Sequence, residues 1–151
     1  MEHHLRIAQP VDGPVEHHPV MDILTLAFSN DAPVRYMFPT AGAYLRNFPR
    51  LATAMAGSAI AAGSAWIADE GAAASLWLAP GAEADRDAII TLVGETVIPE
   101  RQVVLGALGD LMGEFHPKEP QWYLSMIGVA PSRQGQGLGS ALLKAGLARC
   151  D

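Results

Sequence analysis

The chain has 151 residues, of which 50% are hydrophobic and 17% charged, so it indicates one folded domain rather than a disordered segment. Sixteen acidic residues against ten basic ones give a net charge of −6, the wrong sign for a general nucleic-acid-binding protein. No apolar run approaches the roughly 20 residues that span a bilayer, and the first residues lack the pattern of a secretory signal. We therefore expect a cytoplasmic domain with no membrane or nucleic-acid partner.

The spacing of apolar residues predicts the elements of the first third of the chain. Residues 4–8 are expected to form a short strand, and apolar positions three and four apart predict a helix over about 19–29. The segment 29–33 should end that helix. Thr40 is a suitable N-cap for a second helix, which Pro49 is expected to kink or divide.

The remainder of the chain alternates strands and helices. Residues 64–68 and 73–78 are predicted to pair as a hairpin, because both are apolar and a turn sequence separates them. A segment of two helices is expected at about 84–115, and a strand at 121–129. A final helix begins near Leu138. There is no internal repeat or interdomain linker, so a single domain is expected.

A glycine-rich loop separates the last strand from the last helix, with glycines at positions 135, 137 and 139. Without side chains at these positions a ligand can approach the backbone, and several N–H groups can turn toward one anion. The helix adds the positive end of its dipole. Spacing excludes a nucleoside triphosphate loop, because the required lysine is absent. The same spacing matches the dinucleotide-binding fingerprint only weakly, because Ser140 occupies the third glycine position of that fingerprint.

Residues 134–139 match a third pattern, Gln/Arg-x-x-Gly-x-Gly/Ala, at every position. In this pattern the six residues lie between a strand that ends in Val-x-Pro, here Val129 and Pro131, and a helix. On these residues the chain resembles the GNAT superfamily of N-acetyltransferases. The resemblance implies an α/β (α+β) fold, in which helices flank a mixed, mainly antiparallel central sheet. The two helices at 84–115 would be an extra segment before the acetyl-CoA-binding strand.

The family fold normally continues with further strands after the loop helix, and this sequence stops at Asp151. The resemblance therefore predicts that the single acetyltransferase domain over residues 1–151 is C-terminally truncated. Its last strand would then have a free edge, which another copy of the chain could cover in a homo-oligomer. The tyrosine that commonly protonates the leaving thiolate in the family would lie beyond Asp151.

The resemblance also implies where acetyl-CoA binds. The backbone of residues 127–129 would pair with the pantetheine arm, and the loop would hold the pyrophosphate through its N–H groups. A backbone N–H near Gly128 or Val129 would stabilise the oxyanion. Arg133 either contacts a phosphate or is a solvated turn residue. The expected cofactor-binding residues are Ile127, Gly128, Val129, Arg133, Gln134, Gly135, Gln136, Gly137, Leu138, Gly139 and Ser140.

The catalytic candidates are the polar residues that lead into the last strand: Tyr123, Ser125, His116 and Glu119. The family often has a glutamate base four residues before the position of Ile127, and this sequence has Tyr123 there. Tyr123 is either a packing residue or a catalytic one, and strand alternation is expected to place it on the face of Ser125, opposite Met126. His116 and Glu119 are either a base with a water-holding partner or ordinary helix-end and turn residues.

Other reactive side chains are interpreted structurally. Cys150 is the single cysteine, which excludes an internal disulfide, and we expect it to be an inert helical residue. The five histidines are expected to be surface or terminal residues, with no metal site, because adjacent histidines point apart on an extended chain. Core packing is favoured over an acceptor-pocket role for four residues that the resemblance places near that pocket: Phe28, Tyr36, Met37 and Phe38.

The resemblance implies an N-acetyltransferase that moves an acetyl group from acetyl-CoA to an amine of a small molecule, by direct attack in a ternary complex. The acidic surface is compatible with a cationic acceptor. Two alternatives stay open. One is acetylation of a protein N-terminus or lysine, and the other is a non-catalytic acyl-CoA-binding or regulatory module.

Overall fold

The computed structural model describes residues 2–151. Strands and helices follow one another as β1 (Leu5–Ile7), α1 (Pro19–Ala27), α2 (Ala32–Met37), α3 (Ala41–Ala56), α4 (Ser58–Ala61), β2 (Ala65–Ala68), β3 (Ala73–Leu78), α5 (Arg86–Thr96), α6 (Pro99–Phe115), β4 (Tyr123–Val129) and α7 (Leu138–Cys150). Short 3-10 turns lie at Val15–His17 and Pro131–Arg133. In the described chain, no helix combines the length and hydrophobicity that a membrane span requires.

The strands form one four-stranded sheet in the order β1-β2-β3-β4, and all neighbouring strands are antiparallel. The predicted hairpin is confirmed, with Ala65 opposite Leu76 and Ala68 opposite Ala73. Its turn has a left-handed backbone, with φ of 46° at Asp69 and 115° at Gly71. The mixed fold with an antiparallel sheet therefore agrees with the expected α/β architecture.

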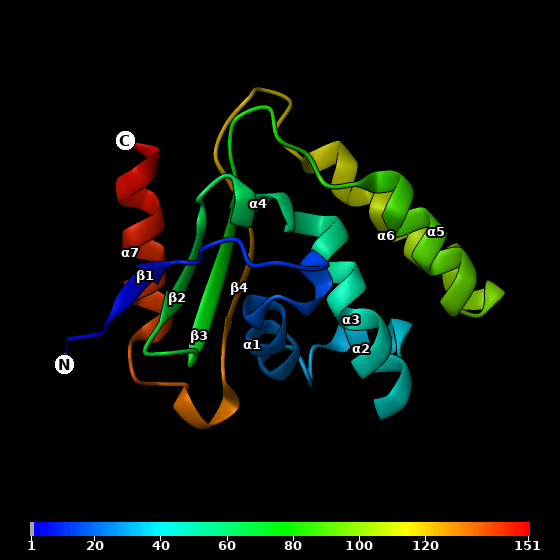
Figure 1. Ribbon diagram of the computed structural model, residues 1–151. Helices are drawn as coiled ribbons and strands as arrows, with labels where there is room; N and C mark the ends of the chain where they lie inside the picture. Colours follow the sequence, from blue (N-terminus) through cyan, green and yellow to red (C-terminus); the bar gives the residue numbers. More distant parts are fainter. Residues whose placement is uncertain (1) are drawn as a thin grey trace.

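Helices cover both faces of this sheet (Figure 1). On one face α7 buries Leu138 and Leu142 against a small cluster that includes Ala68 and Ala73. On the other face α1 and α3 form the main core with alternate residues of the same strands. This core contains the largest fully buried side chains, among them Met21, Leu24, Phe38, Phe48, Ile67 and Leu76.

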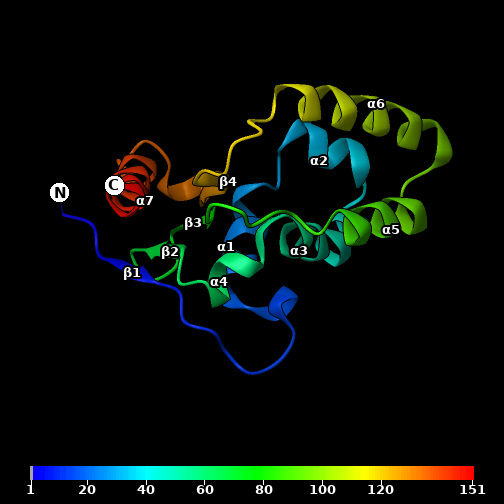
Figure 2. The same ribbon diagram turned by 90° about the horizontal axis from the view of Figure 1, so that it is seen from above.

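Helix α5 lies beside α3, and α6 lies by α2, both on the side of the molecule away from α7 (Figure 2). Leu92 of α5 is buried in the main core, and Arg50 of α3 forms an ion pair of 3.1 Å with Glu95. The guanidinium of Arg101 donates to the Tyr36 carbonyl at 2.9 Å, which links α6 to α2. The predicted two-helix segment is thus present, and it packs as an outer layer.

Helix α6 has an apolar side that no other part of the described chain covers. None of its residues is buried, although Leu105 packs partly against the core. The sheet face that it would otherwise cover is already occupied by α1 and α3. The exposed apolar residues of α6 are Val103, Val104, Leu108, Leu111, Met112 and Phe115.

The first third of the chain departs from the predicted elements at two prolines. Pro33 was expected to lie in a helix-breaking segment, but it occupies the first turn of α2, where its missing N–H costs no hydrogen bond, and Asp31 caps that helix. Pro49 was expected to kink or divide the next helix, yet α3 runs undivided from its N-cap Thr40. Leu45, whose carbonyl Pro49 cannot bond, is exposed, so water can satisfy that carbonyl.

The expectation that the histidines are surface or terminal residues is wrong for His18, and the terminal residue His3 has a covered side chain. His18 is buried and caps α1, because its Nδ1 accepts from the Val20 N–H while its Nε2 donates to the Gln9 carbonyl. The His3 side chain is only 7% exposed and contacts Asp69. Both histidines therefore have structural partners.

The four aromatic and methionine residues that were expected to pack in the core are buried to different degrees. Phe38 is fully buried, while Phe28 and Met37 pack against the main core from its edge. Tyr36 is 38% exposed, and the Arg101 guanidinium lies 5.0 Å from its ring centroid. Core packing is thus confirmed for three of the four positions.

Candidate functional site

Strand β4 has one edge without a strand partner in the described chain, because it pairs with β3 alone. The N–H of Ala130, just after the strand, donates to the Ala72 carbonyl at 2.8 Å. Hydrogen bonding alternates along an antiparallel strand, so Gly128 also points its polar backbone groups toward β3. The N–H and C=O groups of Ile127 and Val129 consequently lie at the free edge.

A β-bulge interrupts β4 in the middle. Leu76 lies opposite Met126 and Trp77 opposite Leu124, so Ser125 has no partner in the register. The bulge corrects the expected strand faces: Tyr123 packs against the same core cluster as Met126, rather than on the opposite face. Simple alternation fails here because the extra residue of a bulge shifts the side-chain phase.

The loop after β4 has the backbone that its glycines allow. Gly135 and Gly137 have φ of 75° and 86°, values in the left-handed region that favours glycine. Gly137 is the residue that precedes α7, and no side chain caps this helix, so its first N–H groups face the loop. A Cβ at position 135 would meet no atom within 4 Å, so the space over this part of the loop is open.

A polar cluster braces this loop from the opposite end of the sequence. Arg133 donates from Nη2 to Asp69 Oδ2 at 3.0 Å and from Nε to the Gln136 side chain at 2.9 Å. The His3 ring contacts Asp69 Oδ2 through Nδ1 and the Gln136 carbonyl through Nε2, each at 2.9 Å. The His3 ring thus joins the β2–β3 turn to the glycine loop.

Asp69 is the centre of this cluster. Its Oδ1 also accepts from the His4 N–H at 2.9 Å. The hydrogen bond from His3, followed by that from the His4 backbone and by the charge of Arg133, holds the pKa of the Asp69 carboxyl below its ordinary value. Asp69 is therefore ionised at neutral pH, and it neutralises part of the charge of Arg133 beside the loop.

The other predicted cofactor residues occupy distinct positions around the loop. Gln134 donates from its side chain to the free-edge carbonyl of Val129 at 3.3 Å. Leu138 is buried under the sheet and fixes the start of α7. A Cβ at Gly139 would lie in ordinary contact with Val129, 3.9 Å from its Cγ2. Ser140 is exposed in the first turn of α7.

Gly128 has a packing role that the sequence did not indicate. A Cβ at this position would lie 2.6 Å from the Ala27 Cβ and 3.2 Å from the Phe28 ring. The glycine therefore lets α1 lie directly against β4. Because the N–H of Gly128 points toward β3, only the N–H of Val129, of the two expected oxyanion donors, lies at the free edge.

The structure brings together only two of the four catalytic candidates. The rings of His116 and Tyr123 meet edge to face, with their centroids 4.7 Å apart. His116 follows the last residue of α6, whereas Tyr123 begins β4. Glu119 is exposed between them, and no side-chain hydrogen bond joins it to His116 in the described chain. Ser125 is half-buried at the bulge.

Cys150 lies in the last turn of α7, as predicted for a helical residue. Its thiol donates to the Gly146 carbonyl at 3.2 Å. Burial, with a smaller effect from Asp151, raises the pKa of the Cys150 thiol. The reactive thiolate is consequently disfavoured at neutral pH.

The bulged edge strand of the antiparallel sheet thus leads into a glycine loop and a helix that begins at that loop. The family model described as acetyltransferase (GNAT) family matches residues 20–151, so the chain belongs to the GNAT acetyltransferase family. Members of this family use acetyl-CoA as the acetyl donor. The family expected from the loop sequence is thereby confirmed, and so is acetyl transfer as the general activity.

Two solved structures show the same fold. One, from Corynebacterium glutamicum, is described as histone acetyltransferase HPA2 and related acetyltransferase. It is 25% identical, with a TM-score of 0.59, and the match covers 100% of this chain and 73% of that one. The other is a mosquito arylalkylamine N-acetyltransferase like 5b, at 18% identity and a TM-score of 0.50, with 98% and 70% covered.

Asp69 and His3 are the site-forming residues that the sequence did not reveal. They reach the loop only through tertiary structure, since His3 lies 133 positions from Gln136. No local motif marks such a contact. Only information about which distant residues lie together in the fold would have predicted the contact.

Proposed function

We propose that this acetyltransferase transfers the acetyl group of acetyl-CoA to the amine of a small molecule, by direct attack in a ternary complex. The observation that carries the proposal is the continuity of the β4 free edge with the left-handed glycine loop. Ile127 and Val129 offer backbone groups to an extended amide-containing arm, and the loop then offers N–H groups to a pyrophosphate. The open space at Gly135 fits such a group.

The loop residues and α7 would hold the donor mainly through the backbone. Arg133 already has two partners, Asp69 and Gln136, so its orientation is fixed before a phosphate arrives. A preorganised guanidinium loses less conformational entropy on binding an anion. We infer that Arg133 contacts a phosphate rather than serving as a solvated turn residue.

In the reaction the amine nitrogen forms a bond to the thioester carbon, the C–S bond breaks, the amine loses a proton and the thiolate gains one. No oxyanion donor is assigned, because the free-edge N–H of Val129 lies six residues, about 20 Å, along β4 from Tyr123 and the proposed base beside it. His116 is the proposed proton acceptor, because the unprotonated nitrogen of an imidazole can accept a proton and its ring meets that of Tyr123 at the start of β4. Ser125 and Glu119 remain polar candidates without a catalytic partner in the described chain.

The proposal is tested by two measurements on the 151-residue protein. Calorimetric titration should show acetyl-CoA binding, and a thiol-release assay across a panel of primary amines should show turnover. A peptide with a free N-terminus and a lysine belongs in the panel, since preferential turnover of that peptide would support the protein-acceptor alternative. Acetyl-CoA binding without turnover of any amine would instead favour a non-catalytic acyl-CoA-binding module.

A further inference from the structure

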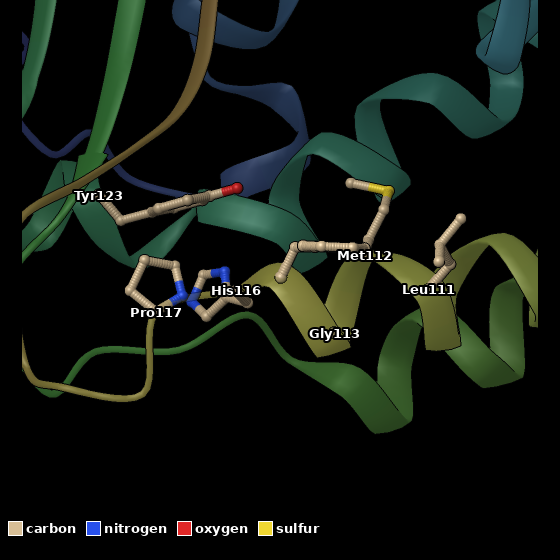
Figure 3. A pocket seen from close by; sticks show the side chains of 7 residues that line it. Leu111, Met112, Gly113, His116, Pro117 and Tyr123 are labelled. Carbon is tan, nitrogen blue, oxygen red and sulfur yellow. The ribbon is translucent and has the colours of Figure 1, made fainter.

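A hollow lies where α6 meets β4 (Figure 3). Its volume is about 480 Å³, within the range of small-molecule sites. We call it the α6 pocket, and its lining residues are Leu111, Met112, Gly113, Phe115, His116, Pro117 and Tyr123. It lies outside the glycine loop and outside the braced Asp69 cluster.

Most of the α6 pocket is apolar. Leucine, methionine, proline and phenylalanine side chains form its wall, and its ionisable lining groups are the His116 imidazole and the Tyr123 hydroxyl. The lining contains no carboxylate. A ligand with several ammonium groups would have to desolvate charges there without counter-charges, which is costly. A ligand with one nitrogen and an apolar body suits this surface.

The polar end of the α6 pocket faces the acetyl-CoA strand. Figure 3 shows the Tyr123 side chain extending from the start of β4 toward α6, with His116 and Pro117 beside it. The bulge at Ser125 separates Tyr123 from the free-edge residues Ile127 and Val129. A nitrogen held at His116 and Tyr123 would therefore approach the strand from the end opposite the glycine loop.

The apolar wall is unusually exposed for a part of a folded domain. Phe115 is 80% exposed and Met112 is 59% exposed. Contiguous exposed apolar surface generally marks a binding site. Flat rings and a thioether favour an aromatic ligand, because ring edges and sulfur both make favourable contacts with a π face.

Building on the proposed acetyl transfer, we propose that the α6 pocket binds the acceptor, and that the acceptor is a primary amine on an aromatic body. The ring lies against Met112 and Phe115, and the nitrogen lies at the His116 and Tyr123 end. The attack is the one described above, with the C–N bond formed as the C–S bond breaks. The wall of α6 thus sets acceptor specificity, while the glycine loop sets the donor.

The test compares Phe115→Ala with Val103→Ala. Both residues lie on α6 and are highly exposed, at 80% and 75%, so neither change should unfold the protein, and Val103 is not a lining residue. With 2-phenylethylamine as acceptor, Phe115→Ala should raise the acceptor KM about tenfold, because a ring contact is lost. The KM for acetyl-CoA should not change. Val103→Ala should leave both constants unchanged.

A second measurement separates this inference from the proposed function. Binding of 2-phenylethylamine to the CoA-loaded protein, followed by NMR or calorimetry, needs no turnover. Phe115-dependent binding without turnover would support the pocket while refuting the enzyme. Turnover of 2-phenylethylamine unaffected by Phe115→Ala, or a preference for spermidine, would overturn the pocket assignment alone.

Sedimentation of the same variants tests whether a second copy of the chain, rather than an acceptor, covers this surface. The proposal expects wild type and Phe115→Ala to have the same mass in solution. If wild type is a dimer that Phe115→Ala dissociates, with no change in acceptor binding, the apolar face of α6 joins two copies of the chain and the acceptor assignment is overturned.

Discussion

Asp69 and Arg133 lie 64 positions apart in the sequence, and Arg133 Nη2 donates to Asp69 Oδ2 across 3.0 Å. Asp69 belongs to the turn between β2 and β3, whereas Arg133 lies at the entrance to the glycine loop. His3 adds a second connection through Asp69 and Gln136. The conformation of the glycine loop therefore depends on residues outside its own motif.

Replacing Asp69 by Asn should weaken acetyl-CoA binding severalfold. The change keeps the shape of the side chain but removes the negative charge that orients Arg133, and it replaces one accepting carboxylate oxygen by an NH2 group. The matched control is Glu70→Gln, which removes the same charge from the next residue of the turn, whose side chain is exposed. Equal Kd values for both variants in calorimetric titration would show that the ion pair does not organise the donor site.

The same carboxylate should make stability depend on pH in the acid range. The pKa of Asp69 is lowered in the folded protein, so its stabilising contribution is present above the ordinary value of 3.8 and is lost as pH falls through the lower folded value. The difference in free energy of unfolding between wild type and Asp69→Asn should shrink on going from about pH 6 to pH 3. Urea denaturation at each pH measures it, and a constant difference would contradict the assignment.

A second ionisable group predicts a change at the alkaline end. Burial raises the pKa of Tyr44 to about 12, and its hydroxyl donates to the Thr25 carbonyl. Tyr44 therefore stabilises the fold below its ordinary value of 10.0, and this contribution falls as pH rises toward 12. Tyr44→Phe should lower stability at pH 8 by about 1 kcal/mol and flatten the loss at alkaline pH. The measurement is the denaturant midpoint of wild type and Tyr44→Phe at pH 8 and 10.5. If both proteins lose the same stability between these pH values, Tyr44 is not responsible for the alkaline loss.

The glycine loop gives a prediction that separates backbone conformation from simple stability. Gly137→Ala places a Cβ on a residue with φ of 86°, which costs about 1 kcal/mol and should weaken acetyl-CoA binding about tenfold. Gly81→Ala is the control, since Gly81 has φ of 83° and open space around it, away from the loop. Both variants should lose similar stability in urea. Only Gly137→Ala should lose affinity, and equal affinities would disconnect the loop from the donor.

Local sequence patterns predicted the elements near the site because those patterns are short-range. Apolar spacing located β4 and α7, and the Gln134 to Gly139 motif located the loop between them. The strand phase at Tyr123 was wrong, because the bulge depends on pairing with β3 rather than on β4 itself. Likewise, the contact of His3 with Gln136 depends on the whole sheet being assembled.

For the helices at 86–115, the apolar spacing predicted the helices correctly but did not determine how they pack. Apolar periodicity predicted α6, and periodicity usually indicates a buried face. The sheet was already covered by α1 and α3, so residues such as Phe115 remain exposed. Competition among helices for one sheet face is a global property, and a single segment does not encode it.

Two glycine-to-alanine changes in helices should have opposite effects on stability. Alanine is normally better than glycine in a helix interior by up to about 1 kcal/mol, so Gly106→Ala in α6, with no atom within 4 Å of the new Cβ, should stabilise the protein. Gly146→Ala in α7 would instead drive a Cβ into the Trp77 indole, which is buried on β3. Overpacking of this kind costs about 1–3 kcal/mol. Urea midpoints should therefore rise for Gly106→Ala and fall for Gly146→Ala. Equal shifts would mean that α7 can move away from the sheet without loss, and the close contact of Gly146 with Trp77 would then not hold the loop helix in place.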